Sequence, residues 1–153
     1  MFMSYIKDLR KFVGHKTIIM PCSAVIVLNE KKEILLQKRV DNGLWALHGG
    51  AIEVDEEIES AARREMYEET GLIADELEFF KVFSGKKNHH IYPNGDEVYI
   101  IDNIFVCKKY HGELSCQKEE VQELKFFSIK DLPKEMMLSN RDIILDYFKS
   151  KGE

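Results

Sequence analysis

The sequence predicts an α/β fold in which a mixed β-sheet lies between helices, with a short additional helix at the N-terminus. Residues 56–70 and 140–149 have the composition or the apolar spacing of helices. Apolar segments of strand length occur at 18–28, 34–39, 77–83, 98–106 and 124–129. Strands interleaved with helices favour a layered α/β structure, and the pattern alone leaves the strand order open.

The length and composition indicate one domain over residues 1–153. A chain of 153 residues buries about 68–70% of its unfolded surface without disulfides or a structural metal. The residues are 44% hydrophobic and 32% charged, which excludes a disordered chain, and no segment is apolar enough to span a membrane. The net charge of −5, without a run of Lys and Arg, argues against a long nucleic acid as partner. A small anionic substrate held by a cation is compatible with this charge.

The cysteines and the N-terminus indicate the compartment. Cys22, Cys107 and Cys116 lack C-x-x-C spacing, and we expect buried or half-buried thiols at all these positions. Charged residues interrupt the apolar residues of segment 1–16, which excludes the apolar core of a signal peptide. The expected location is therefore the reducing cytoplasm, without a membrane partner.

The first part of the chain predicts a helix followed by two strands. Residues 4–13 carry apolar side chains at helical spacing, which predicts a short amphipathic helix. This helix could cap the core or form the contact of a homodimer. The apolar run 18–28 and the segment 34–39, joined by the polar turn 29–33, predict a pair of strands.

The middle of the chain predicts a bend and then the clearest helix. Asp41-Asn42-Gly43 is a turn signal, Leu44–Leu47 is a short apolar segment, and His48-Gly49-Gly50 predicts a sharp bend. Good helix formers fill 56–70, and Gly71 supplies the stop.

The last part predicts strands and a terminal helix. An Asn-Gly turn within 92–96 separates the strands 77–83 and 98–106. A further strand is expected at 124–129, and 140–149 should form an amphipathic helix.

Three carboxylates share one side of the helix 56–70. Glu65, Glu68 and Glu69 are at positions i, i+3 and i+4, so they project together. An adjoining apolar row would seat the helix on the sheet: Ile58, Ala62 and Met66. Like charges at this spacing cost roughly 0.2–0.5 kcal/mol, and carboxylates near a helix C-terminus oppose its dipole. A hard cation such as Mg²⁺, Mn²⁺ or Ca²⁺ would offset both effects, although a Glu-Glu pair alone is more often a solvated surface.

The residues around these carboxylates complete a longer pattern. In sequence order they are Gly50, Glu56, Arg64, Glu65, Met66, Glu68, Glu69, Gly71 and Leu72. This series resembles the signature of the Nudix hydrolase family, G-x5-E-x7-R-E-U-x-E-E-x-G-U, where U is a bulky aliphatic residue. Every fixed position matches, which at roughly 7% for each residue type occurs by chance about once in 10⁸ starting points.

The resemblance implies a Nudix-type α/β/α sandwich. Residues 50–72 correspond to the signature segment, the Nudix box, and residues 1–16 resemble a helical extension found in part of the family. Two residues depart from the usual pattern. Met66 is a softer residue than Ile, Leu or Val and should simply pack. His48 stands where many relatives have Pro; it could touch a phosphate, and we favour exposure to solvent.

By this resemblance, the family's hydrolases attack a diphosphate with water and hold a divalent cation on the box helix. We expect Mg²⁺, with Mn²⁺ able to substitute, because such a cation screens phosphoryl oxygens and acidifies water. The implied ligands are Glu65, Glu68, Glu69 and the Gly50 carbonyl oxygen. Glu65 could also orient or deprotonate the attacking water.

Two further catalytic roles are expected around the box. Arg64 should pair with Glu56 or with a ligand carboxylate and so hold helix and loop in register, the alternative being a surface salt bridge. Relatives often draw another catalytic carboxylate from a distant loop, for which Glu119 and Glu120 are the candidates. A solvated charge run explains that pair equally well.

The candidates for substrate binding are one arginine and several rings. Arg39 could hold a phosphate, and Trp45, Tyr92 or Tyr99 could stack on a base, with ordinary packing as the alternative for each. His89-His90 could reach a cleft, and we favour solvent exposure.

The predicted function is Mg²⁺-dependent cleavage of the diphosphate linkage in a small nucleotide-type substrate. The expected substrate is a nucleoside diphosphate linked to another moiety, as in ADP-ribose-like molecules and nucleotide sugars, or a nucleoside triphosphate. The complete set of box glutamates favours this enzyme over the alternative, a catalytically silent Nudix domain that senses or binds a nucleotide. Residues outside the box select the substrate, so the box leaves it open.

Overall fold

The computed structural model describes residues 4–116 and 119–153, so residues 1–3 of the expected N-terminal extension lie outside it. The helices are α1 (Tyr5–Val13), α2 (Ile58–Thr70) and α3 (Leu138–Ser150), with the short 3₁₀ helices η1 (Lys86–Asn88) and η2 (Ile129–Asp131). The strands are β1 (Ile18–Val27), β2 (Ile34–Arg39), β3 (Trp45–Ala46), β4 (His48–Ala51), β5 (Leu72–Phe83), β6 (His89–Ile91), β7 (Glu97–Gly112) and β8 (Val121–Phe127).

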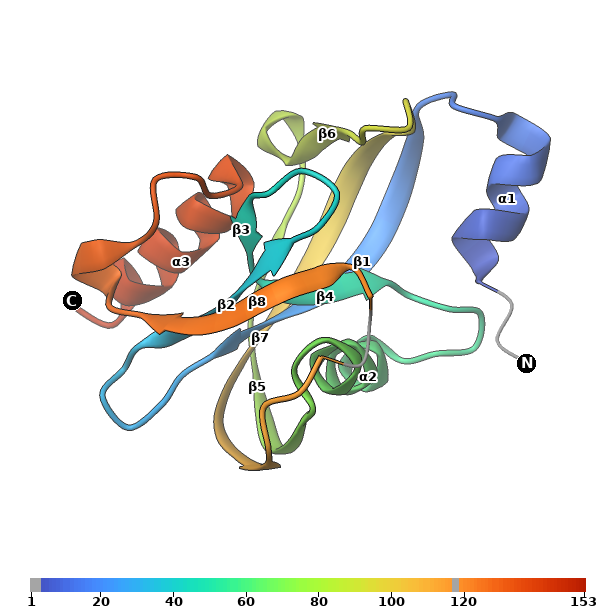
Figure 1. Ribbon diagram of the computed structural model, residues 1–153. Helices are drawn as coiled ribbons and strands as arrows, with labels where there is room; N and C mark the ends of the chain where they lie inside the picture. Colours follow the sequence, from blue (N-terminus) through green and yellow to red (C-terminus); the bar gives the residue numbers. More distant parts are fainter. Residues whose placement is uncertain (1–3, 117–118) are drawn as a thin grey trace.

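In the described part of the chain, the strands form two sheets (Figure 1). The five-stranded sheet has the order β4-β1-β7-β5, and β6 also pairs with β7. It is mixed, because β1 and β7 run parallel while the other pairs are antiparallel. The three-stranded sheet is antiparallel and has the order β3-β2-β8. The predicted α/β class with a mixed sheet is therefore confirmed.

The predicted pairing of the first two strands was wrong. β4 bonds to one edge of β1 and β7 bonds to the other, so neither edge accepts β2. Within residues 4–116 and 119–153, the backbone pairing between these segments is limited to the bridge between Leu28, directly after β1, and Ile34, after which β2 joins the smaller sheet. Neighbouring strands in the sequence often pair, but here the edges of β1 are taken by strands from farther along the chain.

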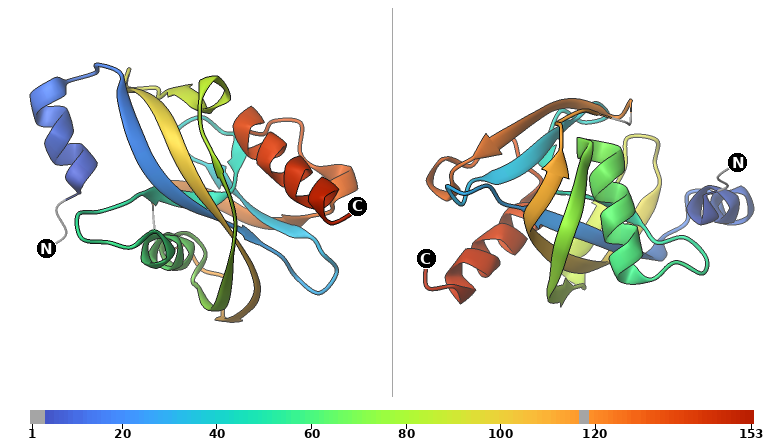
Figure 2. Two further views of the ribbon diagram at one scale, coloured as in Figure 1. Left: turned by 180° about the vertical axis from the view of Figure 1, so that it is seen from behind. Right: turned by 90° about the horizontal axis from the view of Figure 1, so that it is seen from below.

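Alternating side chains of β1 face two different helices. Ile26 packs in a cluster with Ile143 of α3, whereas Val25 and Val27 pack with Met66 of α2. Figure 2 shows α2 and α3 on opposite sides of the larger sheet. Since side chains of a strand alternate between its faces, both faces of β1 are buried, which explains its nearly continuous apolar sequence.

The glycine pair is a strand, although its sequence predicted a bend. Gly49 and Gly50 belong to β4 and pair with Ala24 and Ser23 of β1. A Cβ atom at Gly49 would lie 2.5 Å from the Ser23 carbonyl oxygen, so only glycine allows this close approach.

Strand β5 begins earlier than its sequence pattern predicted. Gly71, with φ of 79°, ends α2, and β5 starts at the next residue instead of at residue 77. Leu72 and Ala74 are buried beneath α2, but the polar residues that follow them hide the alternation in the sequence.

Helix α1 lies at the side of the molecule and is held there by polar contacts (Figure 1). Nη2 of Arg10 donates to the Glu97 carbonyl oxygen at 2.9 Å, and the Tyr5 amide donates to Oε1 of Glu53 at 2.7 Å. Ile6 packs against a small cluster, but Phe12 is 88% exposed. Across residues 4–116 and 119–153, we find no helix with the length and apolar character that crossing a membrane requires.

His48 is a core residue, so both roles considered from the sequence were wrong. Its side chain is fully buried, with Nε2 at 2.9 Å from the Leu35 carbonyl oxygen and Nδ1 at 3.4 Å from Nε2 of Gln37. This position does not expose the ring to solvent or to a phosphate. The imidazole instead links β4 to β2, which lie in different sheets.

We predict that His48 makes the free energy of unfolding depend on pH. An unfolded histidine has a pKa of about 6.5, and burial lowers the pKa of His48 to about 4 in the folded protein. The folded state thus binds this proton more weakly than the unfolded state. The stability from the neutral ring is complete above about pH 6.5 and is lost as the pH falls toward about 4, by up to about 3 kcal/mol.

Urea unfolding of wild type and His48→Gln at about pH 7 and about pH 4 tests this effect. The variant should lose less stability on acidification than wild type. The remaining titratable groups are the same in both proteins, so their contributions cancel when the stability changes of wild type and variant are subtracted. Parallel pH dependence in the two proteins would show that His48 does not carry the effect.

Candidate active site

Helix α2 carries buried carboxylates beside the sheet. Met66 is fully buried and seats the helix as expected, whereas Ile58 is 41% exposed and lies outside that contact. Glu65 and Glu69 are only 4% and 6% exposed, and Glu68 is half-buried. Carboxylates buried to this extent need hydrogen bonds or opposite charges.

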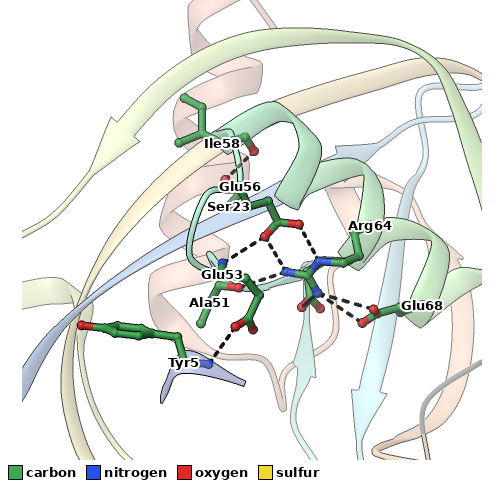
Figure 3. A network of polar contacts seen from close by, with 9 residues as sticks. Tyr5, Ser23, Ala51, Glu53, Glu56, Ile58, Arg64 and Glu68 are labelled. Carbon is green, nitrogen blue, oxygen red and sulfur yellow. Dashed lines mark hydrogen bonds and ion pairs between the residues drawn. The ribbon is translucent and has the colours of Figure 1, made fainter. Parts of the chain in front are cut away.

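The Arg64 guanidinium supplies much of that charge compensation (Figure 3). Its Nε and Nη2 donate to the two carboxylate oxygens of Glu56 at 2.7 and 2.9 Å. Nη2 also donates to the Ala51 carbonyl oxygen at 3.1 Å. Nη1 donates to Oε1 of Glu65 at 2.8 Å and lies 3.5 Å from both carboxylate oxygens of Glu68. Arg64 therefore contacts both kinds of partner expected from the sequence.

These contacts keep Arg64 and Glu56 charged. The hydrogen bond from Arg64 lowers the pKa of Glu56 below its ordinary value. The pKa of Arg64 is raised well above its ordinary range, first by the hydrogen bond to Glu56 and then by the charge and hydrogen bond of Glu65.

The same network fixes the loop that leads into α2 (Figure 3). The Glu53 amide donates to Oε1 of Glu56 at 3.0 Å, and Oγ of Ser23 donates to the Ile58 carbonyl oxygen at 2.8 Å. The loop is thus tied to β1 on one side and to Arg64 on the other.

The glycines of β4 bring the backbone against two carboxylates. The Gly49 amide donates to Oε1 of Glu69 at 2.6 Å. A Cβ atom at Gly50 would lie 2.6 Å from Oε1 of Glu65, so the Glu65 carboxylate fills the space of the missing side chain. Glycine at position 49 therefore allows the close approach of β4 to β1, and glycine at position 50 leaves room for the Glu65 carboxylate of α2.

The carboxylate oxygens of α2 are chemically suited to bind a hard cation. Glu65, Glu68 and Glu69 offer carboxylate oxygens from one side of a helix, and such ligands suit Mg²⁺ or Mn²⁺. In the arrangement seen within residues 4–116 and 119–153, no three His, Cys, Asp or Glu side chains are grouped to hold a metal ion. Glu65 and Glu68 face Arg64, and Glu69 accepts from Gly49.

A cavity of about 90 Å³ adjoins the glycine pair on the α3 side of the larger sheet. Side chains of β1 and β7 form its floor, and the start of α3, the segment β2–β4 and the segment η1–β6 form its walls. Its lining consists of Met20, Cys22, Ala24, Arg39, Ala46, Leu47, Gly49, Gly50, Asn88, His90, Tyr92, Ile100, Asp102, Met137, Ser139 and Asn140.

The cavity and the carboxylates of α2 are electrostatic neighbours. The pKa of the Cys22 thiol is raised first by burial and then by the charges of Asp102 and Glu65. A thiol on the cavity floor is thus close enough to a carboxylate of α2 to sense its charge. We therefore treat the cavity and the acidic side of α2 as one site.

Arg39 belongs to the cavity and also senses the charge of Glu69 on α2. It lines the cavity, and its Nε and Nη2 donate to both oxygens of Asp41 at 2.9 and 2.8 Å. Burial on its own lowers the pKa of Arg39. The hydrogen bonds and charge of Asp41 outweigh burial, with smaller contributions from Tyr92 and Glu69, so the pKa is raised above its ordinary value. The guanidinium therefore stays charged where a phosphate could reach it.

The paired histidines occupy different surroundings. His90 lines the cavity, with its Nε2 3.3 Å from Oγ of Ser139, so the favoured solvent exposure was wrong for this residue. Burial, followed by the charges of Arg39 and His89, lowers its pKa. His89 instead bonds to Glu97 at 2.6 Å and stacks on Tyr99.

Asp102 is a cavity residue that the sequence analysis missed. It is 9% exposed, and burial raises its pKa to about 7. The signal was present, because Asp102 is an acidic residue within the apolar strand-like run 98–106. Acidic side chains are rarely buried in such a strand unless they have a functional role or a hydrogen-bonding partner.

Trp45 and the pair Glu119 and Glu120 lie away from the cavity lining. Trp45 is 8% exposed and packs in the core, with its ring in a T-shaped arrangement with Phe127 at 4.8 Å between ring centroids. Glu119 and Glu120 are exposed in a turn before β8. The Glu120 carbonyl oxygen accepts from the Val40 amide at 2.9 Å, which puts this turn next to Arg39 in the chain fold.

Sequence comparisons agree with this geometry. The NUDIX domain model matches residues 20–147. The chain is 34% identical over 150 residues to an ADP-ribose pyrophosphatase of Methanocaldococcus jannaschii, covering 95% of this chain and 82% of that protein. It is 33% identical over 127 residues to the nucleoside triphosphatase NudI of Escherichia fergusonii, covering 76% of this chain and 84% of the relative.

Solved structures share the fold. A MutT protein of Methanosarcina mazei superposes with a TM-score of 0.73 at 20% identity, covering 90% of this chain and 99% of that chain. The NUDIX domain of Shewanella oneidensis NrtR, crystallised with ADP ribose, gives 0.70 at 17% identity and covers 97% and 99%. With the family model matching most of the sequence, the chain belongs to the Nudix hydrolase family and is a pyrophosphohydrolase.

Proposed function

We propose that this protein hydrolyses the diphosphate linkage of a nucleoside diphosphate joined to another group, with Mg²⁺ as its cation. The observation that carries the proposal is the burial of Glu65 and Glu69 against the glycines of β4, beside a cavity lined by both polar and apolar residues. Buried carboxylates next to an open cavity suit a cation that in turn holds phosphoryl oxygens.

The proposed cation ligands are Glu65, Glu68, Glu69 and the Gly50 carbonyl oxygen. When bound, Mg²⁺ neutralises charge on the diphosphate and lowers the pKa of water, and Mn²⁺ is expected to substitute. Glu65 is proposed to orient or deprotonate the attacking water. Its buried carboxylate is well placed for this, because contact with Gly50 and Arg64 holds it still.

Arg39 and Glu120 are proposed to act at the entrance to the site. Arg39 would hold a phosphate, a role that its retained charge and its position in the cavity lining support. Glu120 would assist the attacking water from the neighbouring turn. Its exposure is equally consistent with a solvated surface residue, so kinetics of Glu120→Gln decide between these roles.

The first substrate to test is an ADP-ribose-like molecule. A relative named ADP-ribose pyrophosphatase aligns with 95% of this chain, and a relative named nucleoside triphosphatase aligns with 76%. The proposed location is the cytoplasm, where the free thiols of Cys22 and Cys107 stay reduced.

We predict that ADP-ribose, nucleotide sugars or nucleoside triphosphates are cleaved with Mg²⁺ and not in EDTA. ADP-ribose should give AMP and ribose 5-phosphate, which chromatography or ³¹P NMR separates. Tight binding of these compounds without cleavage would instead support a nucleotide-sensing domain. Full activity in EDTA would refute the proposed cation dependence.

We predict that Glu68→Gln lowers kcat by about 10²-fold or more, the magnitude expected for a positioned acidic group. The side chain is half-buried and lies 3.5 Å from Arg64, so its removal should leave the fold intact. Glu59→Gln is the matched control, because Glu59 lies on the same helix and is exposed. Equal kinetics for both variants and wild type would exclude Glu68 from the machinery.

We predict that Arg64→Lys lowers activity or apparent Mg²⁺ affinity by about 10- to 100-fold, as expected for a residue that orients ligands. An ammonium group keeps the charge but does not reproduce the paired hydrogen bonds to Glu56. Mg²⁺ titrations of kcat/KM measure the effect, with Arg63→Lys on the same helix as control. Wild-type Mg²⁺ dependence in Arg64→Lys would argue against this role.

A further inference from the structure

The floor of the cavity contains a polar atom that lacks a protein partner. Oδ1 of Asp102 is one of the two buried side-chain polar atoms without a hydrogen bond among the described residues, the other being Nε of Arg10. Arg10 has a carboxylate near this nitrogen, since Asp96 lies 3.6 Å away. Asp102 has no basic side chain among the causes of its pKa shift, and the residue belongs to the lining of an open cavity, although Oδ1 itself is buried.

Other polar side chains of the same cavity are engaged by the protein. Nδ2 of Asn88 donates to the carbonyl oxygens of Phe83 and Ile100 at 3.0 and 3.2 Å. Oδ1 of Asn140 accepts from the Leu47 amide at 2.8 Å. These asparagines hold the walls together, whereas Oδ1 of Asp102 makes no comparable contact.

Burial of such an oxygen opposes folding. Leaving a buried polar atom without a partner removes its hydrogen bonds to water and destabilises the folded state. An apolar residue would fit the run of β7 better, because its neighbours on the same side, Ile100 and Ile104, are apolar. A carboxyl group that disfavours folding, on a residue that lines an open cavity, points to a ligand in that cavity.

The cavity adjoins the proposed site of hydrolysis at the glycines of β4. Asp102 pairs in register with Cys22, whose thiol senses the charges of both Asp102 and Glu65. Gly50, in contact with Glu65, also lines the cavity. A substrate with its diphosphate at the carboxylates of α2 therefore has its organic part within reach of the cavity floor.

We infer that Asp102 is a specificity-determining residue whose carboxyl group accepts a hydrogen bond from an N–H or O–H group on the organic part of the substrate. This inference rests on the proposed function, because it assigns the cavity to the same substrate. The donor comes either from the edge of a nitrogen base or from a sugar hydroxyl, which present the same chemistry to the carboxyl group.

The chemistry of the carboxyl group suits selective binding. With a pKa raised to about 7 by burial, Asp102 is partly protonated near neutral pH, so the carboxyl can donate as well as accept. A buried site that hydrogen-bonds a substrate discriminates strongly against analogues without that group, because its own polar atoms are then left unpaired.

The test compares Asp102→Leu, Asp102→Asn and Asn88→Leu with wild type in the presence of Mg²⁺. Asp102→Leu should lower kcat/KM by about 10- to 100-fold, the effect of losing a hydrogen bond to a charged or strongly polar group. Its Tm should stay level or rise. Asp102→Asn keeps the shape and an acceptor oxygen and should retain most of the activity.

Asn88→Leu is the matched control from the same cavity. The substitution removes the side-chain amide of Asn88 and leaves two backbone carbonyl groups without their donor, so the Tm of this variant should fall. A structural role for Asp102 would make Asp102→Leu behave in the same way. Loss of activity together with retained or raised Tm is therefore the signature of substrate recognition.

Two series of substrates identify the donor group. One series changes the base at a constant sugar, and the other changes the sugar at a constant adenine. The ratio of kcat/KM between wild type and Asp102→Leu should vary in one series and stay constant in the other. Either result supports the inference and identifies the part of the substrate in the cavity.

Equal kcat/KM for wild type and Asp102→Leu on every substrate that wild type cleaves would overturn the inference and leave the proposed hydrolase intact. If wild type cleaves none of these compounds, the proposed function fails instead. Calorimetric titration with ADP-ribose then tests Asp102 separately: equal affinity for wild type and Asp102→Leu, or no binding by either protein, would overturn its role in recognition.

Discussion

The hydrogen bonds between Arg64 and Glu56 are the interaction on which the site depends. Helix α2 carries three carboxylates at adjacent positions and no basic residue in its last turn, which is unfavourable in isolation. Hydrogen bonds between charged groups contribute about 1.5–3 kcal/mol each, which exceeds the roughly 0.2–0.5 kcal/mol cost of a like-charge pair. Because Arg64 also reaches Ala51, Glu65 and Glu68, one guanidinium holds the helix, the preceding loop and β4 together.

The larger sheet separates the two parts of the site, which lie on its opposite faces. Strand β1 is buried on both faces, with α2 packed on one and the cavity and α3 on the other. Strand β4 lies at the edge where these sides meet. It carries glycines there because a side chain would meet Ser23 or Glu65. The metal-binding chemistry proposed for α2 and the recognition proposed for Asp102 therefore adjoin each other at β4.

The sequence predicted contacts well where the residues involved are close together in the chain. Spacing placed Glu65, Glu68 and Glu69 on one side of a helix, and the family resemblance gave Arg64 either Glu56 or a ligand carboxylate as partner. Arg64 contacts both, because these contacts lie within one helix and its adjoining loop. It did not predict the separation of β1 and β2 into two sheets, which depends on strands from distant parts of the chain. His48 and Asp102 were misjudged or missed for the same reason, since their burial is decided by neighbours in space.

The location of a bound cation tests the central claim most directly: Glu65, Glu68 and Glu69 receive a cation while Arg64 stays on Glu56. Anomalous scattering from crystals soaked in Mn²⁺ measures this location. We predict a Mn²⁺ peak beside these three carboxylates, with the hydrogen bonds from Arg64 to Glu56 preserved. A peak at other side chains, or no peak at saturating Mn²⁺ with the glutamates still facing Arg64 and Gly49, would contradict it.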